Sequence, residues 1–318
     1  MNHLPPRNHR IVTVTLGLAF SLMLCGCNSL VSRFFAKSMS QMSEPTEPIE
    51  NKIVSPLRPA VSLSVLWVGH ATVLIQIHDK VILTDPVFTR TVGLVAKRSK
   101  DPGIDTDAIT RLNAILISHI HFDHFAYGSL DVLPKAASLY VPVGGLAYTP
   151  EFGFSELHAA RAWQTIDDDG LRITPVPVRH FGGRYGFDAA WNAEPTWTGY
   201  VIEYRGTTIF FAGDTGYDPE LFKDIGRRFK IDLALIPIAP IEPRDFMSRV
   251  HTDPPEALHI FEDVGAKLMI PIHHETFFQG LEPEASYAKN IMQKLITERG
   301  LKDRVKILEI GEQVILRE

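Results

Sequence analysis

The chain has 318 residues, a formal net charge of −5 and an apolar fraction of 45%, which is ordinary for a globular protein. This charge provides no basic field for nucleic acid, so no nucleic-acid partner is expected. The only two cysteines, Cys25 and Cys27, precede the part expected to fold, which excludes disulfides and thiolate metal ligands from that part.

The first 26 residues have the features of a bacterial lipoprotein signal peptide. Arg7 and Arg10 precede an apolar run from Ile11 to Leu24, which is too short to cross a bilayer comfortably, since that takes about 20 residues. The run ends in a segment that resembles the lipoprotein box, and the resemblance implies cleavage before Cys27 and acylation of that cysteine. An uncleaved anchor or an ordinary secretory signal is the alternative.

Membrane attachment through the acylated Cys27 places the protein in the bacterial cell envelope. Asn28 is not the aspartate that often signals inner-membrane retention, so the outer membrane is expected. Residues 27–60 are predicted to be a flexible tether, because they are rich in Ser, Glu and Pro with little apolar periodicity. Such a tether spans on the order of 30 Å. Residues 61–318 are predicted to form one domain.

Short β-rich runs dominate this domain, and a few helices follow. The predicted strands are Val65–Val68, Val73–Ile77, Val81–Thr84, Ala114–Ile117, Leu139–Val141, Leu171–Val178, Gly199–Tyr204, Thr207–Phe211, Leu233–Ile238, Lys267–Ile272, Val305–Ile310 and Gln313–Leu316. Helices are predicted to begin at Asp218 and at Asp253, where an N-cap precedes prolines or a capping-box Glu. A third spans Glu284–Glu298. The pattern predicts two mixed sheets covered by helices.

The segment Ser118–His124 has the composition of a metal site. It follows an apolar run, as expected for a buried strand that delivers a site at its carboxyl end. Imidazole and carboxylate together suit zinc and neighbouring transition metals. Residues two apart on an extended chain point the same way, so His119 and His121 can bind one ion, while Asp123 and His124 can face a second. A surface loop that happens to be His-rich is the alternative.

Three later strands end in further ligand-type residues. His180, Asp214 and His273 each follow an apolar run, and Asp214 lies in a turn flanked by glycines. Because each residue comes directly after a predicted buried strand, we expect the three side chains to converge at one sheet edge with the His119 loop.

Other motifs accompany these residues. They are Trp67–Thr72, Leu83–Pro86, Gly213–Tyr217, Ile231–Ile238, Glu242-Pro243-Arg244, His251–Pro254 and Ile272-His273. With them, the chain resembles the metallo-β-lactamase superfamily over roughly residues 61–315. It is most similar to the branch that contains N-acyl-phosphatidylethanolamine-hydrolysing phospholipase D and bacterial RomA-type envelope proteins, and the Glu-Pro-Arg and His-x-Asp-Pro segments point to that branch.

The resemblance implies an α/β fold, the four-layer αββα sandwich, with two divalent metal ions. The implied ligands are His119, His121 and His180 for the first ion, Asp123, His124 and His273 for the second, and Asp214 for both. Zinc is the expected metal, with iron or manganese as alternatives. The attacking group would be a hydroxide shared by two ions about 3.5–4 Å apart, and Asp123, Asp214 and His251 are the implied catalytic residues.

Several histidines and one aspartate have less certain roles. His251 precedes a predicted helix N-terminus, which favours anions, so it would bind the substrate phosphate or protonate the leaving group; a plain loop histidine is the alternative. His70 and Asp85 are predicted to orient ligands, with packing or turn roles as alternatives. His274, next to His273, is predicted to point to the other face.

Seven aromatic or apolar residues flank the predicted ligands, namely Phe181, Trp191, Trp197, Phe246, Met247, Phe277 and Phe278. Plain core packing is the commoner role for such residues, and an apolar groove for acyl chains is the alternative. Two segments depart from the family pattern: Ala239-Pro240-Ile241 replaces a frequent Gly-Ala-Tyr, and Gly182–Trp197 is longer than usual. Both are expected to border the substrate, so they leave its identity open.

The sequence therefore predicts a lipid-anchored metal-dependent hydrolase. The expected substrate is a phospholipid-like phosphodiester, cleaved as by a phospholipase D. A lactone or carboxylic-ester hydrolase is the first alternative, because other branches use similar ligands, and β-lactam hydrolysis fits the branch motifs less well. A non-catalytic envelope lipoprotein that affects permeability is a further alternative, against which the complete ligand set argues.

Overall fold

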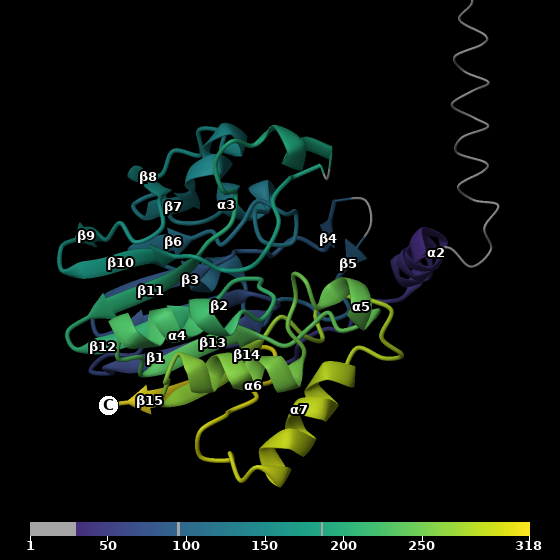
Figure 1. Ribbon diagram of the computed structural model, residues 1–318. Helices are drawn as coiled ribbons and strands as arrows, with labels where there is room; N and C mark the ends of the chain where they lie inside the picture. The colour runs from purple at the N-terminus through teal and green to yellow at the C-terminus, as the bar shows by residue number, and fades with distance from the viewer. Residues whose placement is uncertain (1–29, 94–95, 186) are drawn as a thin grey trace, which may run out of the picture.

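Two β-sheets pack face to face in the computed structural model, which describes residues 30–93, 96–185 and 187–318 (Figure 1). The first sheet has seven strands in the order β15-β1-β2-β3-β6-β7-β8, and the second has six in the order β14-β13-β12-β11-β10-β9. Helices and loops cover the outer faces, so the predicted αββα sandwich is confirmed.

The first sheet changes from antiparallel to parallel pairing at β3. Its strands are β1 (Leu63–Gly69), β2 (Thr72–Ile77), β3 (Lys80–Thr84), β6 (Ala114–Leu116), β7 (Ser138–Pro142), β8 (Glu156–Ala160) and β15 (Gln313–Arg317). Strands β15, β1, β2 and β3 pair antiparallel, whereas β3, β6, β7 and β8 pair parallel. Consequently β1, β3 and β6 all run in one direction and end at the same edge.

The second sheet has the same mixed character. Its strands are β9 (Ile166–Asp168), β10 (Leu171–Val176), β11 (Gly199–Tyr204), β12 (Thr207–Phe211), β13 (Leu233–Pro237) and β14 (Leu268–Ile272). Strands β12, β13 and β14 are parallel, and β10 runs in their direction because β11 is antiparallel to both β10 and β12. A small separate ribbon joins β4 (Thr91–Val92) to β5 (Ala96–Lys97).

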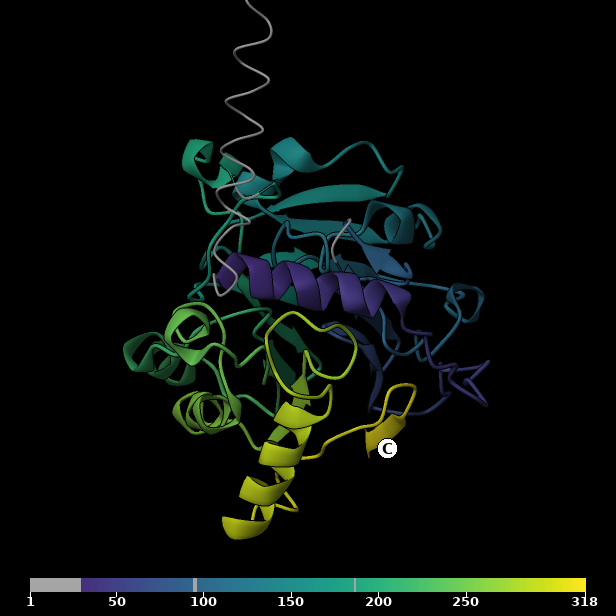
Figure 2. The ribbon, with the colours of Figure 1, turned by 90° about the vertical axis from the view of Figure 1, so that its right-hand side faces the viewer.

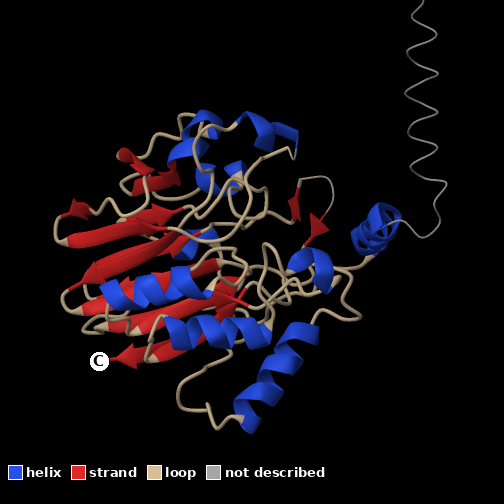
Figure 3. Ribbon diagram, viewed as in Figure 1, coloured by secondary structure: helices blue, strands red, loops and turns tan. Residues whose placement is uncertain are grey.

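Helices cover the second sheet more completely than the first (Figure 3). The helices of the described residues are α2 (Leu30–Ser43), α3 (Tyr127–Asp131), α4 (Pro219–Arg228), α5 (Arg244–Met247), α6 (Pro254–Asp263) and α7 (Tyr287–Glu298). Three short 3-10 helices are η1 (Thr106–Ala108), η2 (Val143–Tyr148) and η3 (Phe187–Trp191). Helices α4, α6 and α7 pack their apolar sides on the second sheet. Within the described ranges, none of the helices has the length and apolarity needed to cross a membrane.

The cores follow from the alternation of side chains along a strand. Val65 and Trp67 of β1 point between the two sheets, whereas Leu66 and Val68 pack under the outer layer. Strands buried on both faces read as continuous apolar runs, which is why the apolar stretch before Ser118 marks the central strand β6.

The predicted helix starts at Asp218 and Asp253 are confirmed. Asp218 accepts a hydrogen bond from the Leu221 N–H at 3.3 Å, and Asp253 accepts one from the Glu256 N–H at 2.9 Å. The capping box at α6 is only half formed, because the Glu256 carboxylate binds the Arg244 guanidinium instead of the cap backbone.

The predicted strand over Val305–Ile310 is wrong. Val305 forms an isolated bridge with Met269, and Leu308 and Ile310 then turn into the core between the sheets. The apolar pattern there reflects packing rather than strand pairing. Two short edge strands, β8 and β9, were not predicted, because exposed positions interrupt their apolar pattern.

The described part of the predicted tether is ordered against the domain. Residues 30–43 form α2, and residues 44–60 run along the body. The Glu47 N–H donates to the Ser99 carbonyl at 2.8 Å, and the Arg58 N–H donates to Gln76 Oε1 at 2.9 Å. The composition suggested flexibility, but these bonds to the domain satisfy the backbone. The predicted signal peptide over residues 1–26 and Cys27 lie outside the described residues.

Tyr200 on β11 ties the two sheets together directly before the His119 loop. Its hydroxyl donates to the Ile117 carbonyl at 2.8 Å, and both residues are buried. We expect Tyr200→Phe to lower the free energy of unfolding by about 1–3 kcal/mol, because a buried carbonyl loses a donor. Equilibrium urea unfolding measures the change.

Tyr204→Phe is the matched control on the same strand, since the Tyr204 hydroxyl bonds the exposed Asp79 at 3.0 Å. That substitution should change the stability by no more than about 0.5 kcal/mol. Equal effects of the two substitutions would contradict the role given to Tyr200.

Candidate metal centre

The strand directions bring the predicted ligands to one edge of the sandwich. The His119 loop follows β6, His180 follows β10, Asp214 follows β12, and His273 comes directly after β14. His70 and Asp85 come after β1 and β3 in the same way. Because these strands all end at this edge, side chains from six distant places in the sequence meet there.

His119, His121 and His180 form the first group. Their ligand atoms lie within 4.8 Å of one another, and His180 Nε2 is 3.4 Å from His121 Nδ1. The His180 Nδ1 lies 3.0 Å from the Val250 carbonyl, so a proton on Nδ1 bonds that oxygen. This tautomer leaves the Nε2 lone pair directed at the centre of the group.

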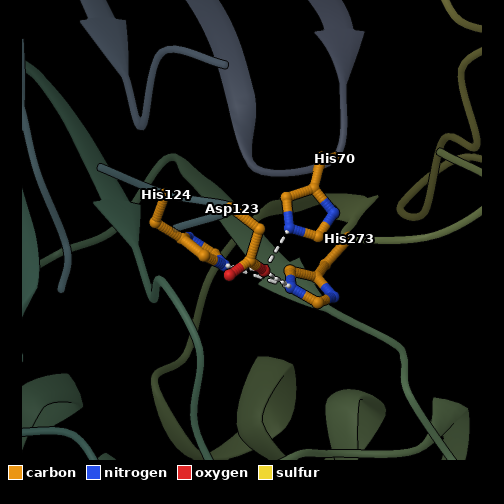
Figure 4. Close-up of side chains that lie close together, drawn as sticks. All are labelled: His70, Asp123, His124 and His273. Atoms are coloured by element: carbon orange, nitrogen blue, oxygen red, sulfur yellow. Dashed lines mark hydrogen bonds and ion pairs between the residues drawn. The ribbon is translucent and has the colours of Figure 1, made fainter. Parts of the chain in front are cut away.

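Asp123, His124 and His273 form the second group, and His70 joins them (Figure 4). Nε2 of His124 is 3.2 Å from both Asp123 Oδ2 and His273 Nε2. His70 Nε2 lies 2.9 Å from Asp123 Oδ2. His70 is therefore positioned to orient Asp123, as predicted, and its nitrogen also lies at ligand-type distance from the other members.

Asp214 lies between the two groups, where the predicted bridging ligand belongs. Its carboxylate is 3.3 Å from His124 Nε2 and 3.1 Å from His273 Nε2 in the second group, and 3.9 Å from His119 Nε2 in the first. The preceding Gly213 has φ of +60°, and a Cβ there would collide with the Ser118 side chain. Glycine thus allows the Asp214 turn to approach the histidine loop.

Asp85 orients the second group from behind. Its Oδ2 accepts a bond from His124 Nδ1 at 2.6 Å, and its Oδ1 accepts the Ser118 N–H at 2.6 Å. A carboxylate on the far nitrogen of a histidine fixes the ring and its tautomer. The arrangement matches the orienting role predicted for Asp85.

Three non-glycine residues of the centre have left-handed backbone. The φ values are +56° for His70, +33° for Asp85 and +64° for His273. Such conformations cost of order 1–3 kcal/mol each and occur mainly at functional sites. The His273 N–H donates to the His70 carbonyl at 2.9 Å, and the Trp67 indole N–H donates to the same oxygen at 2.9 Å. These bonds hold the two turns together.

Charge at the centre is unbalanced without a cation. Asp85, Asp123 and Asp214 are buried, and in the described parts of the chain their ion pairs are with histidines and with no Lys or Arg. Burial lowers the pKa of His273, but the nearby carboxylates of Asp214 and Asp123 outweigh this effect and raise the pKa to about 9. Burial also lowers the pKa of His124, but Asp214, Asp123 and Asp85 together raise it well above its usual value.

The residues present fit divalent cations. Burial lowers the pKa of His119 and His180 well below the usual range, so both are neutral ligands at neutral pH. Nε2 of His119 is buried and has no hydrogen-bond partner among the residues that the structure describes. Since leaving a buried nitrogen unpaired costs free energy, His119 Nε2 is suited to bind a metal ion. A metal in the second group would replace the protons on His124 and His273.

His251 faces Asp214 at the mouth of the centre. Its Nδ1 is 3.6 Å from Asp214 Oδ2, and no described residue forms a hydrogen bond with it. Burial is the largest cause that lowers the pKa of His251 to about 4. The imidazole is therefore neutral at pH 7, which favours binding of a phosphate oxygen over delivery of a proton to the leaving group.

The predicted use of the α6 N-terminus for anion binding does not agree with the structure. The Asp253 carboxylate already caps that end, and Pro254 and Pro255 have no N–H to offer. Arg244 has a role that the sequence did not indicate: its guanidinium donates to the His251 carbonyl at 3.1 Å and contacts Asp253 at 3.3 Å. It thereby holds the His251 loop in place.

His274 lies apart from the ligand groups, as predicted. It is buried with its ring 4.3 Å from that of Trp67 and its Nδ1 3.4 Å from the Glu275 carboxylate. The aromatic residues that flank the ligands have different environments. Phe277 is core and packs edge-on against His70, Phe278 lines a groove, and Trp191 is 74% exposed.

Arg184 fixes the His119 loop, a role that the sequence did not indicate. Its guanidinium donates to the Ile120 carbonyl at 2.9 Å and to the Phe125 carbonyl at 3.0 Å, and it stacks over Phe122 and Tyr127. The segment Gly182–Trp197 thus supports the ligand loop. No periodicity or motif marks a single arginine for such a contact, so only the folded chain identifies it.

Comparisons with known proteins agree with this geometry. Residues 80–274 match the family described as the beta-lactamase superfamily domain. The chain is 27% identical over 294 residues to an N-acyl-phosphatidylethanolamine-hydrolyzing phospholipase D from Caenorhabditis elegans, which covers 86% of this chain and 82% of that protein. It is 28% identical over 252 residues to a metal-dependent hydrolase from Methanopyrus kandleri, which covers 79% of this chain and 98% of that protein.

A solved structure shares the fold. The metallo hydrolase Igni18 from Ignicoccus hospitalis superposes with a TM-score of 0.60 at 20% identity, covering 79% of this chain and 97% of the other. At this identity the likeness shows the fold and no more.

The neighbouring residues His273 and His274 provide a direct test of the ligand geometry. We expect His273→Gln to lose at least one equivalent of bound metal, because its nitrogen lies in the second group. His274→Gln should retain the wild-type metal content, since His274 points at Trp67. Elemental analysis after gel filtration measures both, and equal losses would contradict the assignment.

Arg184→Lys tests the support of the ligand loop. Lysine keeps the charge but lacks the planar guanidinium, which stacks on Phe122 and Tyr127 while its Nη1 donates to both carbonyls. We expect metal affinity to fall about 10–100-fold, as is typical for partners that orient ligands, measured by competition with a chelating indicator. Arg179→Lys is the control, because Arg179 adjoins the ligand His180 but its guanidinium donates to the Tyr217 carbonyl, outside the ligand loop. Equal affinities of the two variants would count against the role of Arg184.

Proposed function

Because this chain belongs to the metallo-β-lactamase superfamily of metal-dependent hydrolases, we propose that it hydrolyses phospholipid-like phosphodiesters in the manner of a phospholipase D. The proposal includes two divalent ions in the centre, with zinc as the expected metal. The position of Asp214 between two complete ligand groups is the observation that carries it.

Two further points favour this substrate class. The relative from Caenorhabditis elegans is named for hydrolysis of an N-acyl-phosphatidylethanolamine, and it aligns over 86% of this chain. The centre is also lined by carboxylates already engaged with histidines, so an anionic phosphate needs cations to approach it. Divalent ions supply that charge when bound, and they also lower the pKa of water.

The protein's own residues would then orient the substrate. Asp214 and Asp123 set the positions of the cations, and Asp85 and His70 hold the ligand rings and carboxylates rigid behind them. His251 is half-buried at the mouth and neutral at pH 7. Its imidazole would donate an N–H to a non-bridging phosphate oxygen and hold the scissile bond over the centre.

The N-terminal segment would hold the enzyme at a membrane. We propose cleavage before Cys27 and acylation of that residue, so that the body stands on the envelope membrane of a bacterium, with the outer membrane as the expected site. The support is the charged flank, the apolar run and the cysteine-containing box within residues 1–27. Incorporation of radiolabelled palmitate, lost in Cys27→Ser, would test this attachment.

Turnover of bis(p-nitrophenyl) phosphate and of N-acyl-phosphatidylethanolamine by metal-loaded protein tests the proposed reaction. We expect both to be hydrolysed and Asp214→Asn to reduce kcat/KM by more than about 100-fold, since outer partners alone give 10–100-fold losses. Asp218→Asn is the control, because Asn also caps a helix well. Hydrolysis of lactones or carboxylic esters with no phosphodiester turnover would refute the proposal.

A further inference from the structure

A groove of about 520 Å³ opens beside the metal centre, and helix α2 forms one of its walls. Small-molecule sites have roughly 300–1,000 Å³. We propose that this groove binds one acyl chain of the substrate and that α2 confers a preference for long-chain substrates. The inference rests on the proposed function for the identity of the substrate, but the groove itself can be tested without hydrolysis.

The groove joins apolar walls to the ligand loop. Its apolar lining comes from α2, the β4–β5 ribbon and two aromatic residues near the centre. These residues are Phe34, Phe35, Met39, Val92, Ala96, Phe122 and Phe278. His121 and Asp123 lie in the same lining, so a molecule in the groove reaches the metal ligands at one end. A ligand with a reactive head and an apolar tail matches this division.

Helix α2 is held in place from its middle and its carboxyl end. The Lys37 ammonium donates to the Glu282 carbonyl, and the Lys97 ammonium donates to the Met42 carbonyl at 3.3 Å. Figure 2 shows the helix lying across the face of the molecule that contains the loops of the metal centre. Because both attachments are to the domain, the wall exists before a ligand arrives.

Two of the lining side chains are exposed to water. Phe35 is 59% exposed and Met39 is 56% exposed, one helical turn apart on α2. Large apolar side chains exposed together on a concave surface indicate a binding site. An acyl chain would cover both, and each buried methylene contributes about 0.8 kcal/mol.

Charge in the groove favours an anionic amphiphile. Among the described residues, the groove has Lys37 and Arg184 as cationic lining residues and Asp123, at the metal end, as an acidic one. The Lys37 ammonium lies 4.8 Å from the centre of the Phe278 ring, so cation and apolar surface adjoin. A phosphodiester with an acyl tail places its negative charge at the ligand end and its tail along α2.

Helix α2 lies outside residues 80–274, the part that matches the family. Most of the metal centre lies within this match, whereas His70 and this wall of the groove come from the segment that precedes it.

Replacement of the exposed wall residues tests the inference. The double variant Phe35→Ser/Met39→Ser is compared with Val132→Ser/Leu157→Ser, whose residues are 59% and 51% exposed and lie outside the groove lining. Metal-loaded protein is titrated with dansyl-undecanoic acid below its micelle concentration. We expect binding about tenfold weaker in the α2 variant and unchanged in the control.

A kinetic arm uses monomeric alkyl p-nitrophenyl phosphates of increasing chain length. For the wild type and the control, KM should fall by up to about fourfold for each added methylene, until the groove is filled. In the α2 variant this dependence should flatten, while kcat/KM for the tail-free bis(p-nitrophenyl) phosphate stays unchanged.

Equal probe affinity in the two variants would overturn the inference. The inference would also fail if the α2 variant lowered only the hydrolysis of substrate presented in vesicles, since that result would identify α2 as a membrane contact. If no phosphodiester is hydrolysed but the probe still depends on α2, the proposed reaction fails and the groove stands.

Discussion

Burial of three carboxylates at one edge of the sandwich is the constraint on which the rest of the structure depends. Asp85, Asp123 and Asp214 are removed from water, and among the described residues their ion-pair partners are histidines. Buried charge is costly unless it is neutralised. Protons on His124 and His273 can do this in the free protein, and a metal ion bound by the same histidines would do it in their place.

Strand direction explains how such a centre can be assembled at all. Each ligand follows a strand that ends at the same edge, so the two sheets supply a rigid frame for short ligand loops. Rigidity is also needed to hold the left-handed backbone at His70, Asp85 and His273. The hydrogen bond between the His273 N–H and the His70 carbonyl joins the two sheets at this point of strain.

Supporting contacts come from segments that contain none of the predicted metal ligands. Arg184, in the long segment after His180, holds the ligand loop through two carbonyls. Helix α2, which precedes the matched residues, forms a wall of the groove that leads to the same loop. The shared edge thus provides the chemistry, and the surrounding segments adjust how firmly ligands are held and what can reach them.

The sequence by itself determined most of the strands and the seven residues that meet at the centre, because apolar runs and ligand-type residues are local patterns, and its motifs carried the resemblance to the fold family. Only the tertiary structure decided that residues 30–43 form a helix packed on the domain, and only it gave the roles of Arg184 and Arg244. The same is true of the capped N-terminus of α6 and the packing of Val305–Ile310. Each of these depends on a partner far away in the sequence. A local pattern cannot specify such a partner, since the contact exists only when the chain has folded.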